Sequence, residues 1–298
     1  MQTRRLAPIV SLSALCCAVA SAAEPQSIGM LGPAGAVVKI RGDFKFLEGP
    51  AADSAGNVVF TDIPDEKIYK LDAGGTISVF REKSNNTNGT MFNAAGELIG
   101  CEMQGRVVAM DAAGKVKRVV ADKYEGQRFN APNDLVVDSQ GGVYFTDPHF
   151  RAPTPLPQGV TAVYYAAADG KVTRLVDDLK APNGVILSPD EKTLYVVPSM
   201  QAEMMAYPVE GPGKLGAGRV FCTLKQPAGA AGKGATGSRS TNRGISTSRR
   251  RSACRCSTRA GRRWGSLRCR SNRPTARSAA PTARRSTSPR ARRSTPCR

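Results

Sequence analysis

The residues of this sequence that could do chemistry are oxygen-bearing side chains at recurring positions. Asn133 and Asn183 each follow a proline and fall at the same point of two successive, similar segments. Glu48 stands before Gly-Pro at the start of an expected strand, where its carboxylate can point into a central channel. Hard cations such as Ca²⁺ take carboxylate and amide oxygens as ligands. The same residue types also suit ordinary turns, in which asparagine bonds to its local backbone and glutamate stays on the surface.

Four segments that repeat one pattern are the elements that must position these residues. They begin at Glu48, Asn88, Pro132 and Pro182, which lie 40 to 50 residues apart. Each segment has a short half-apolar stretch, a turn of Asp, Asn, Ser and Gly, and a second stretch such as VVFTD or VYFTD. Alternation followed by a glycine-rich turn predicts β-hairpins. Further text such as KIYKLDAGGTISVF gives about four short strands per interval, which is typical of a propeller blade.

The motifs of these segments resemble those of a known family. Glu-Gly-Pro at 48, Asn-Gly at 88, Pro-Asn-Asp at 132 and Pro-Asn-Gly with SPDEKTLY at 182–195 are similar in order and spacing to the gluconolactonase, senescence marker protein and luciferin-regenerating enzyme family. The resemblance covers about residues 40–225. It implies an all-β fold, a six-bladed β-propeller, of which about four blades would be intact here.

The resemblance also implies a metal site. The family binds one divalent cation, usually Ca²⁺, through a Glu, one or more Asn and an Asp from different blades. Carried over to this sequence, the metal ligands are Glu48, Asn133 and Asn183. Another divalent cation, such as Zn²⁺, Mg²⁺ or Mn²⁺, is the alternative cofactor.

Four other residues are candidates for the same site. By resemblance, Asn88 lies where the family contacts substrate oxygens, although its NNTNGT context also fits a solvated turn. Glu102 could line the same funnel and bind substrate. Asp134 and the only histidine, His149, are the candidates for catalytic proton transfer. In the family, however, the metal and a carboxylate do this work.

The N-terminus has the pattern of a secretory signal. Arg4 and Arg5 precede an apolar run from Leu6 to Val19, and small residues follow at 20–23. The apolar run is too short for a membrane span. We expect a signal peptide over 1–23 and a mature protein that is periplasmic or secreted, without a stable membrane span after cleavage.

The C-terminal part has a different composition from the body. From Gly237 to Arg298 there are 19 Arg and no Lys, Asp or Glu, which accounts for the whole formal net charge of +19. Apart from Trp264 the tail lacks the aromatic residues of a nucleic-acid platform, and secretion removes most nucleic-acid partners. We therefore expect no nucleic-acid partner, and a disordered tail over 233–298.

A shifted reading frame would explain this tail. With suitable codons, residues 235–247 in the shifted frame become DGLAIDESRHLYI, which has the shape of DLVVDSQGGVYFT in the body. Residues 277–288 become FGGPDRKTLYI, which reproduces the SPDEKTLY text. We thus expect an incomplete propeller over 24–232, without the family's aspartate from a later Asp-Gly motif.

Together these features predict a secreted or periplasmic, Ca²⁺-dependent hydrolase of lactones, similar to gluconolactonases. Its partner would be a small lactone or ester, and loss of the last blades would impair this chain. Two alternatives stay open. One is a non-enzymatic propeller that binds a peptide or sugar, and the other is a phosphoester or aryl-ester hydrolase on the same scaffold.

Overall fold

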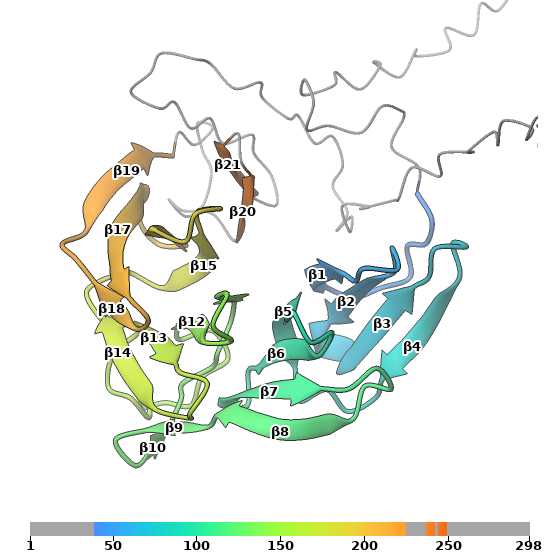
Figure 1. The fold of residues 1–298 in the computed structure, drawn as a ribbon. Helices are drawn as coiled ribbons and strands as arrows, with labels where there is room; N and C mark the ends of the chain where they lie inside the picture. Colours follow the sequence, from blue (N-terminus) through green and yellow to red (C-terminus); the bar gives the residue numbers. More distant parts are fainter. Residues whose placement is uncertain (1–38, 225–236, 242–243, 249–298) are drawn as a thin grey trace, which may run out of the picture. The chain divides into compact units, whose positions relative to one another are not determined.

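The computed structural model describes residues 39–224, 237–241 and 244–248, and almost all of its regular structure is β-strand (Figure 1). In this part of the chain the only helix is one 3₁₀ turn, η1 (Ile63–Asp65). The described residues therefore include no helix with the length and apolarity of a membrane span. The expected signal peptide over 1–23 lies outside them.

Four antiparallel sheets, which we call blades 1 to 4, follow one another along the chain, coloured from blue to orange in Figure 1. Blade 1 contains β1 (Leu47–Ala52), β2 (Val58–Asp62), β3 (Lys67–Leu71) and β4 (Ile77–Arg81). Blade 2 contains β5 (Thr87–Phe92), β6 (Leu98–Glu102), β7 (Arg106–Met110) and β8 (Val116–Ala121). A small hairpin of β9 (Lys123–Tyr124) and β10 (Gln127–Arg128) follows.

The second half of the described chain repeats this order. Blade 3 contains β11 (Leu135–Val137), β12 (Val143–Asp147), β13 (Ala162–Ala166) and β14 (Val172–Val176). Blade 4 contains β15 (Pro182–Leu187), β16 (Thr193–Pro198), β17 (Glu203–Gly211) and β19 (Arg219–Thr223). The short β18 (Lys214–Leu215) pairs with the far end of β17.

The four repeated segments are the first hairpin of each blade, so the expected all-β fold of short antiparallel strands is confirmed. Their turns are local: the N–H of Gly56 bonds to the carbonyl of Asp53, and that of Gly141 bonds to Asp138. Both glycines have positive φ, 84° and 82°, which L-residues rarely adopt. The positive φ therefore explains why glycine occupies this turn position.

The blades pack through buried middle strands. Every residue of β2, β6, β12 and β13 is buried. Strands covered on both faces bury both sets of alternating side chains. The first strands contact one another in chain order, β1 with β5, β5 with β11 and β11 with β15. This contact between first strands brings the starts of the four blades together.

The tail contains one further hairpin, β20 (Gly237–Thr241) and β21 (Gly244–Ser248), and β20 contacts β15. These ten residues belong to the part of the chain for which disorder was expected, and they form paired strands. Strand pairing uses backbone groups and tolerates threonine and isoleucine well, so an arginine-rich composition does not prevent it. The remaining residues of the expected tail lie outside the described part of the chain.

Candidate site at the starts of the first strands

The three expected metal ligands and the expected substrate contact, Asn88, stand where the first strand of each blade begins. Glu48 lies in β1, Asn88 in β5 and Asn183 in β15, and at each of them the pairing with the second strand shifts register. Asn133 precedes β11, and its N–H bonds to the carbonyl of Thr146 over 2.8 Å. Bulges of this kind redirect side chains beside active sites. The four residues thus occupy equivalent positions in four successive blades.

The asparagine side chains at these positions are buried but have little to bond to. Asn133 is 5% exposed, Asn183 7% and Asn88 9%. Among the hydrogen bonds of the described residues, none involves the side-chain amide of Asn133 or Asn183, and the Asn88 amide nitrogen lies 3.8 Å from the sulfur of Met103. By contrast, the Asn130 amide bonds to two carbonyls and accepts one N–H.

These amides face open space and are not sealed in the core. Ser84 Oγ is the only fully enclosed side-chain polar atom without a partner that the described residues contain. The amide atoms of Asn133 and Asn183 must therefore reach solvent. Buried polar groups without a protein partner generally bind water or an ion. The two amides are thus available as ligands.

The backbone of each asparagine is fixed from the preceding blade. The bonds run from Thr61 Oγ1 to the carbonyl of Asn88 (3.1 Å), from the Gly89 N–H to that of Asn133 (2.7 Å), and from Thr146 Oγ1 to that of Asn183 (2.7 Å). In blade 1, the carbonyl of Gly49, next to Glu48, accepts Thr90 Oγ1 over 2.6 Å. Each asparagine backbone is therefore held by the preceding blade, while the side-chain amides of Asn133 and Asn183 have no protein partner among the described residues.

Gly89 allows the closest approach between blades at this end. A Cβ at this position would lie 2.7 Å from the carbonyl oxygen of Asn133, and 2.8 Å from Cα and Oδ1 of Asp134. Those distances are below van der Waals contact, so a side chain would push β5 away from Asn133. This close packing explains why glycine follows Asn88 in blade 2.

Asp134 is half-buried beside Asn133 and belongs to the same inter-blade network. Its Oδ1 accepts the N–H of Leu135 over 2.9 Å, and its Oδ2 accepts that of Val185 in blade 4 over 3.2 Å. Burial raises its pKa to about 7, and the two N–H donors oppose that rise. Asp134 therefore lies next to a candidate ligand, and its catalytic role stays a prediction.

Glu102 has a structural role that the sequence did not indicate. Its side chain is fully buried at the end of β6. Its carboxylate accepts Arg81 Nη2 over 2.8 Å and Asn85 Nδ2 over 3.0 Å, and it also pairs with Arg106 Nε. These donors give Glu102 a structural role between blades 1 and 2, and its expected contact with substrate stays a prediction.

His149 is not brought into the buried set. It lies in the loop after β12 and is exposed, with its ring 4.8 Å from that of Phe150. No hydrogen bond of the described residues involves its imidazole. A general base must lie within reach of the proton that it takes. The structure therefore gives no support to His149 as a catalytic residue.

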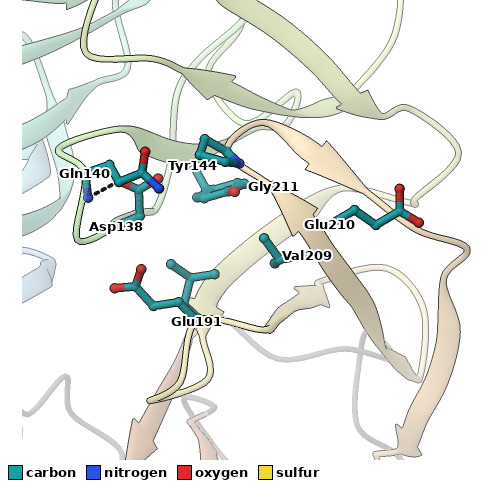
Figure 2. Close-up of a pocket in the computed structure, with 9 residues that line it drawn as sticks. Asp138, Gln140, Tyr144, Glu191, Val209, Glu210 and Gly211 are labelled. Atoms are coloured by element: carbon teal, nitrogen blue, oxygen red, sulfur yellow. Dashed lines mark hydrogen bonds between the residues drawn. The ribbon is translucent and has the colours of Figure 1, made fainter.

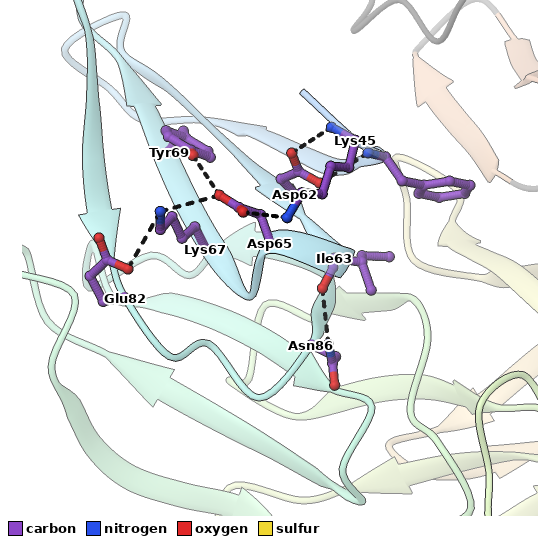
Figure 3. Close-up of polar contacts among 9 residues, drawn as sticks. Lys45, Asp62, Ile63, Asp65, Lys67, Tyr69, Glu82 and Asn86 are labelled. Atoms are coloured by element: carbon purple, nitrogen blue, oxygen red, sulfur yellow. Dashed lines mark hydrogen bonds and ion pairs between the residues drawn. The ribbon is translucent and has the colours of Figure 1, made fainter. Parts of the chain in front are cut away.

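Two aspartates missed by the sequence analysis fix the chain as it enters blades 1 and 3. Asp62 accepts the N–H groups of Lys45 and Phe46 over 2.8 and 2.9 Å, as Figure 3 shows for Lys45. Asp147 accepts those of Asn130 and Ala131 over 2.8 and 2.7 Å. The sequence pattern that could have revealed them is the repeated Thr-Asp ending of VVFTD and VYFTD, from which only a strand was predicted.

Figure 3 also shows a link from blade 1 to the segment before blade 2. The Asn86 amide donates to the carbonyl of Ile63 over 2.9 Å. Asn85 and Asn86 have positive φ, 53° and 54°, which is uncommon outside glycine. Strained backbone of this kind collects near functional sites. This segment leads directly into Thr87 and Asn88.

A pocket of about 210 Å³ lies between blades 3 and 4, beside their hairpin turns (Figure 2). It is therefore at the opposite end of the first strands from the candidate ligands. Its carboxylates already have partners: Asp138 accepts the N–H groups of Gln140 and Gly142, and Glu191 accepts Ser139. We assign this pocket no role in the site.

No three His, Cys, Asp or Glu side chains of the described residues cluster as a metal site. The expected set, one carboxylate with asparagine amides, is of another kind and uses oxygen atoms only. Oxygen ligands suit Ca²⁺ and Mg²⁺ better than soft metals. The donor chemistry therefore fits a hard divalent cation.

Comparison with known proteins gives one consistent answer. Residues 46–236 match the family model described as SMP-30/Gluconolactonase/LRE-like region. A gluconolactonase from Zymomonas mobilis is 30% identical over 200 residues, which are 60% of this chain and 56% of that protein. The chain thus spans a little over half the length of the curated relatives it matches.

Solved structures agree with the sequence comparison. A gluconolactonase from Xanthomonas campestris superposes with a TM-score of 0.68 at 28% identity, covering 77% of this chain and 78% of that one. A calcium-binding protein, regucalcin, from Agrobacterium tumefaciens gives a TM-score of 0.63 at 22% identity, covering 77% of this chain and 76% of its own. At that identity the second likeness concerns the fold alone.

Proposed function

The chain belongs to the SMP-30/Gluconolactonase/LRE-like family, and we propose that it is a metal-dependent hydrolase of lactones. The gluconolactonase and lactonase relatives support the lactone substrate. One observation carries the metal dependence: Asn133 and Asn183, at equivalent positions of successive blades, are buried with unbonded amides. We propose Ca²⁺ as the cation, held by these two amides and by Glu48.

The residues of this chain would divide the work as follows. A bound divalent cation supplies a Lewis acid that polarises the lactone carbonyl and lowers the pKa of water. The Asn88 amide, beside the metal ligands, would donate to a substrate oxygen. Asp134 is the carboxylate that we assign to proton transfer, because it adjoins Asn133 within the same inter-blade network.

An assay of lactone hydrolysis with and without Ca²⁺ tests this proposal. We expect the purified chain to hydrolyse a sugar lactone with added Ca²⁺ and to lose that activity in EDTA. Asn183→Ala should abolish it, whereas His149→Ala should leave it unchanged. Hydrolysis that persists in EDTA would contradict metal dependence. Binding of Ca²⁺ without turnover of lactones or phosphoesters would favour the non-enzymatic binder.

We also propose that the protein is exported and that its tail comes from a shifted frame that lowers its activity. The signal-like N-terminus supports export. The shifted text DGLAIDESRHLYI, which resembles the hairpins of the body, supports the shifted frame. Sequencing the gene across codons 220–240 tests this, and an unbroken frame would exclude it.

A further inference from the structure

Two threonines occupy matching places beside the candidate site. Thr61 is the fourth residue of VVFTD in blade 1 and Thr146 the fourth of VYFTD in blade 3, each one residue before the aspartate that fixes the entering chain. Both are fully buried. Thr61 lies directly opposite Glu48 in the β1–β2 pairing, and the backbone of Thr146 bonds to Asn133 and Asp134. Both threonines therefore adjoin the residues that we assign to the site.

Their hydroxyl groups bond outside their own blade. Thr61 Oγ1 donates to the carbonyl of Asn88 over 3.1 Å, and Thr146 Oγ1 to that of Asn183 over 2.7 Å. Thr146 Oγ1 also accepts the N–H of Asp134 over 3.1 Å. In both cases the acceptor belongs to the residue whose side chain faces the site, at a strand bulge. A hydroxyl bond to this carbonyl fixes the backbone of the asparagine, and therefore the position from which its amide side chain extends.

Blade 2 shows that the threonine is not required by the sheet itself. The corresponding residue is Cys101, which is buried and free. The carbonyl of Asn133 in the next blade is instead held by the Gly89 N–H over 2.7 Å. All three asparagine carbonyls are thus tied to the preceding blade, twice by threonine and once by backbone.

We propose that Thr61 and Thr146 are positioning residues with different targets. Thr146 sets the Asn183 amide for the cation, and Thr61 sets the Asn88 amide for the substrate. This inference rests on the proposed function, because it needs Asn183 as a metal ligand and Asn88 as a substrate contact. The two bonds are chemically alike, so removing each should affect only what its asparagine binds: Ca²⁺ for Thr146 and the substrate for Thr61.

Valine and serine substitutions test the hydroxyl groups directly. Thr146→Val should raise the Kd for Ca²⁺, measured by isothermal titration, about tenfold, as loss of outer-shell partners does at metal sites. Thr146→Ser should bind Ca²⁺ like the wild type, because it keeps the hydroxyl. Thr61→Val should leave the Kd for Ca²⁺ unchanged and raise KM for the lactone about tenfold, with Thr61→Ser as its rescue.

Controls separate this inference from the proposed function. If Thr146→Val binds Ca²⁺ like the wild type while Asn183→Ala does not bind it, the positioning role is wrong and the ligand role stands. If Asn183→Ala also binds normally, the ligand role itself fails. Equal losses in Thr146→Val and Thr146→Ser would overturn the role of the hydroxyl. Should the valine variant not fold, Thr146→Ala removes the same hydroxyl with less bulk in the core.

Discussion

The two ends of each blade are held by different kinds of contact. At the turn end, most backbone bonds close within a few residues, such as Gly75 N–H to Asp72 and Gly114 N–H to Asp111, and the bond from Ser139 to Glu191 is a long-range contact between two turns. At the ligand end, bonds join distant segments: Thr61 to Asn88 spans 27 residues, and Val185 to Asp134 spans 51. The turn end can form in an isolated hairpin, whereas the ligand end requires neighbouring blades to pack.

The two ends of strand β6 can be compared through a glutamate at each end. Glu97, before its start, pairs with Lys117 and Arg118 and accepts the Asn93 amide, with its side chain 16% exposed. Glu102, at its end, likewise has two cationic partners and the Asn85 amide, but it is fully buried. Similar partners at different burial make the two glutamates a matched pair.

The largest effect on stability should come from this pair. Glu102→Gln leaves Arg81 and Arg106 without their buried anion, and we expect a loss of about 3 kcal/mol in the free energy of unfolding. Glu97→Gln breaks exposed pairs and should cost less than about 1 kcal/mol. Urea unfolding of both variants measures the difference. Equal losses would show that the two ends do not differ in this way.

A glycine pair sharpens the comparison with a smaller effect. Gly89→Ala places Cβ against Asn133 and Asp134, so we expect a loss of about 2 kcal/mol, as for overpacking, together with weaker Ca²⁺ binding. Gly96→Ala, in a turn with φ of 76° and open space around it, should cost about 1 kcal/mol. It should leave Ca²⁺ binding unchanged. Thermal melting with and without Ca²⁺ reads both properties, and a Ca²⁺ effect in Gly96→Ala would break the distinction.

A pH dependence of stability is expected at Asp147, at the ligand end of blade 3. Burial raises the pKa of this carboxyl from 3.8 to about 7, against the N–H bonds of Asn130 and Ala131. The folded chain therefore holds this proton more tightly than the unfolded chain does. Its contribution to stability is full below about pH 4 and falls by about 1.4 kcal/mol per pH unit until about pH 7.

Asp147→Asn removes this titration, so stability should fall less steeply between these pH values than in the wild type. Urea unfolding near pH 4 and near pH 8 measures the slope separately from any constant loss caused by the missing acceptor. An unchanged slope would exclude Asp147 as its source.

The same contrast explains how much the sequence could predict. The hairpins were predictable because each turn, such as Asp138–Gly141, is encoded within four residues. The equivalence of Asn133 and Asn183 was visible as a repeat. The bonds of Thr61 and Thr146 were not, because their acceptors lie 27 and 37 residues away in another blade.

Glu102 shows the same limit from the opposite side. Its position in the repeat suggested a residue that faces the site. Its real environment depends on Arg81, from the last strand of blade 1, and on Asn85, from the segment between blades. The burial of a charged side chain follows from such packing, which spacing in the sequence does not encode.

The central claim is that residues at the starts of the first strands share one divalent cation. Isothermal titration of Ca²⁺ into the wild type and Glu48→Gln tests it most directly. Glu48 is the only anion of the proposed ligand set, and ligand charge strongly affects Ca²⁺ affinity, so its loss should raise Kd about 100-fold. Glu97→Gln, at the turn end, should bind Ca²⁺ like the wild type. Equal Ca²⁺ affinity in the wild type and Glu48→Gln would contradict the account.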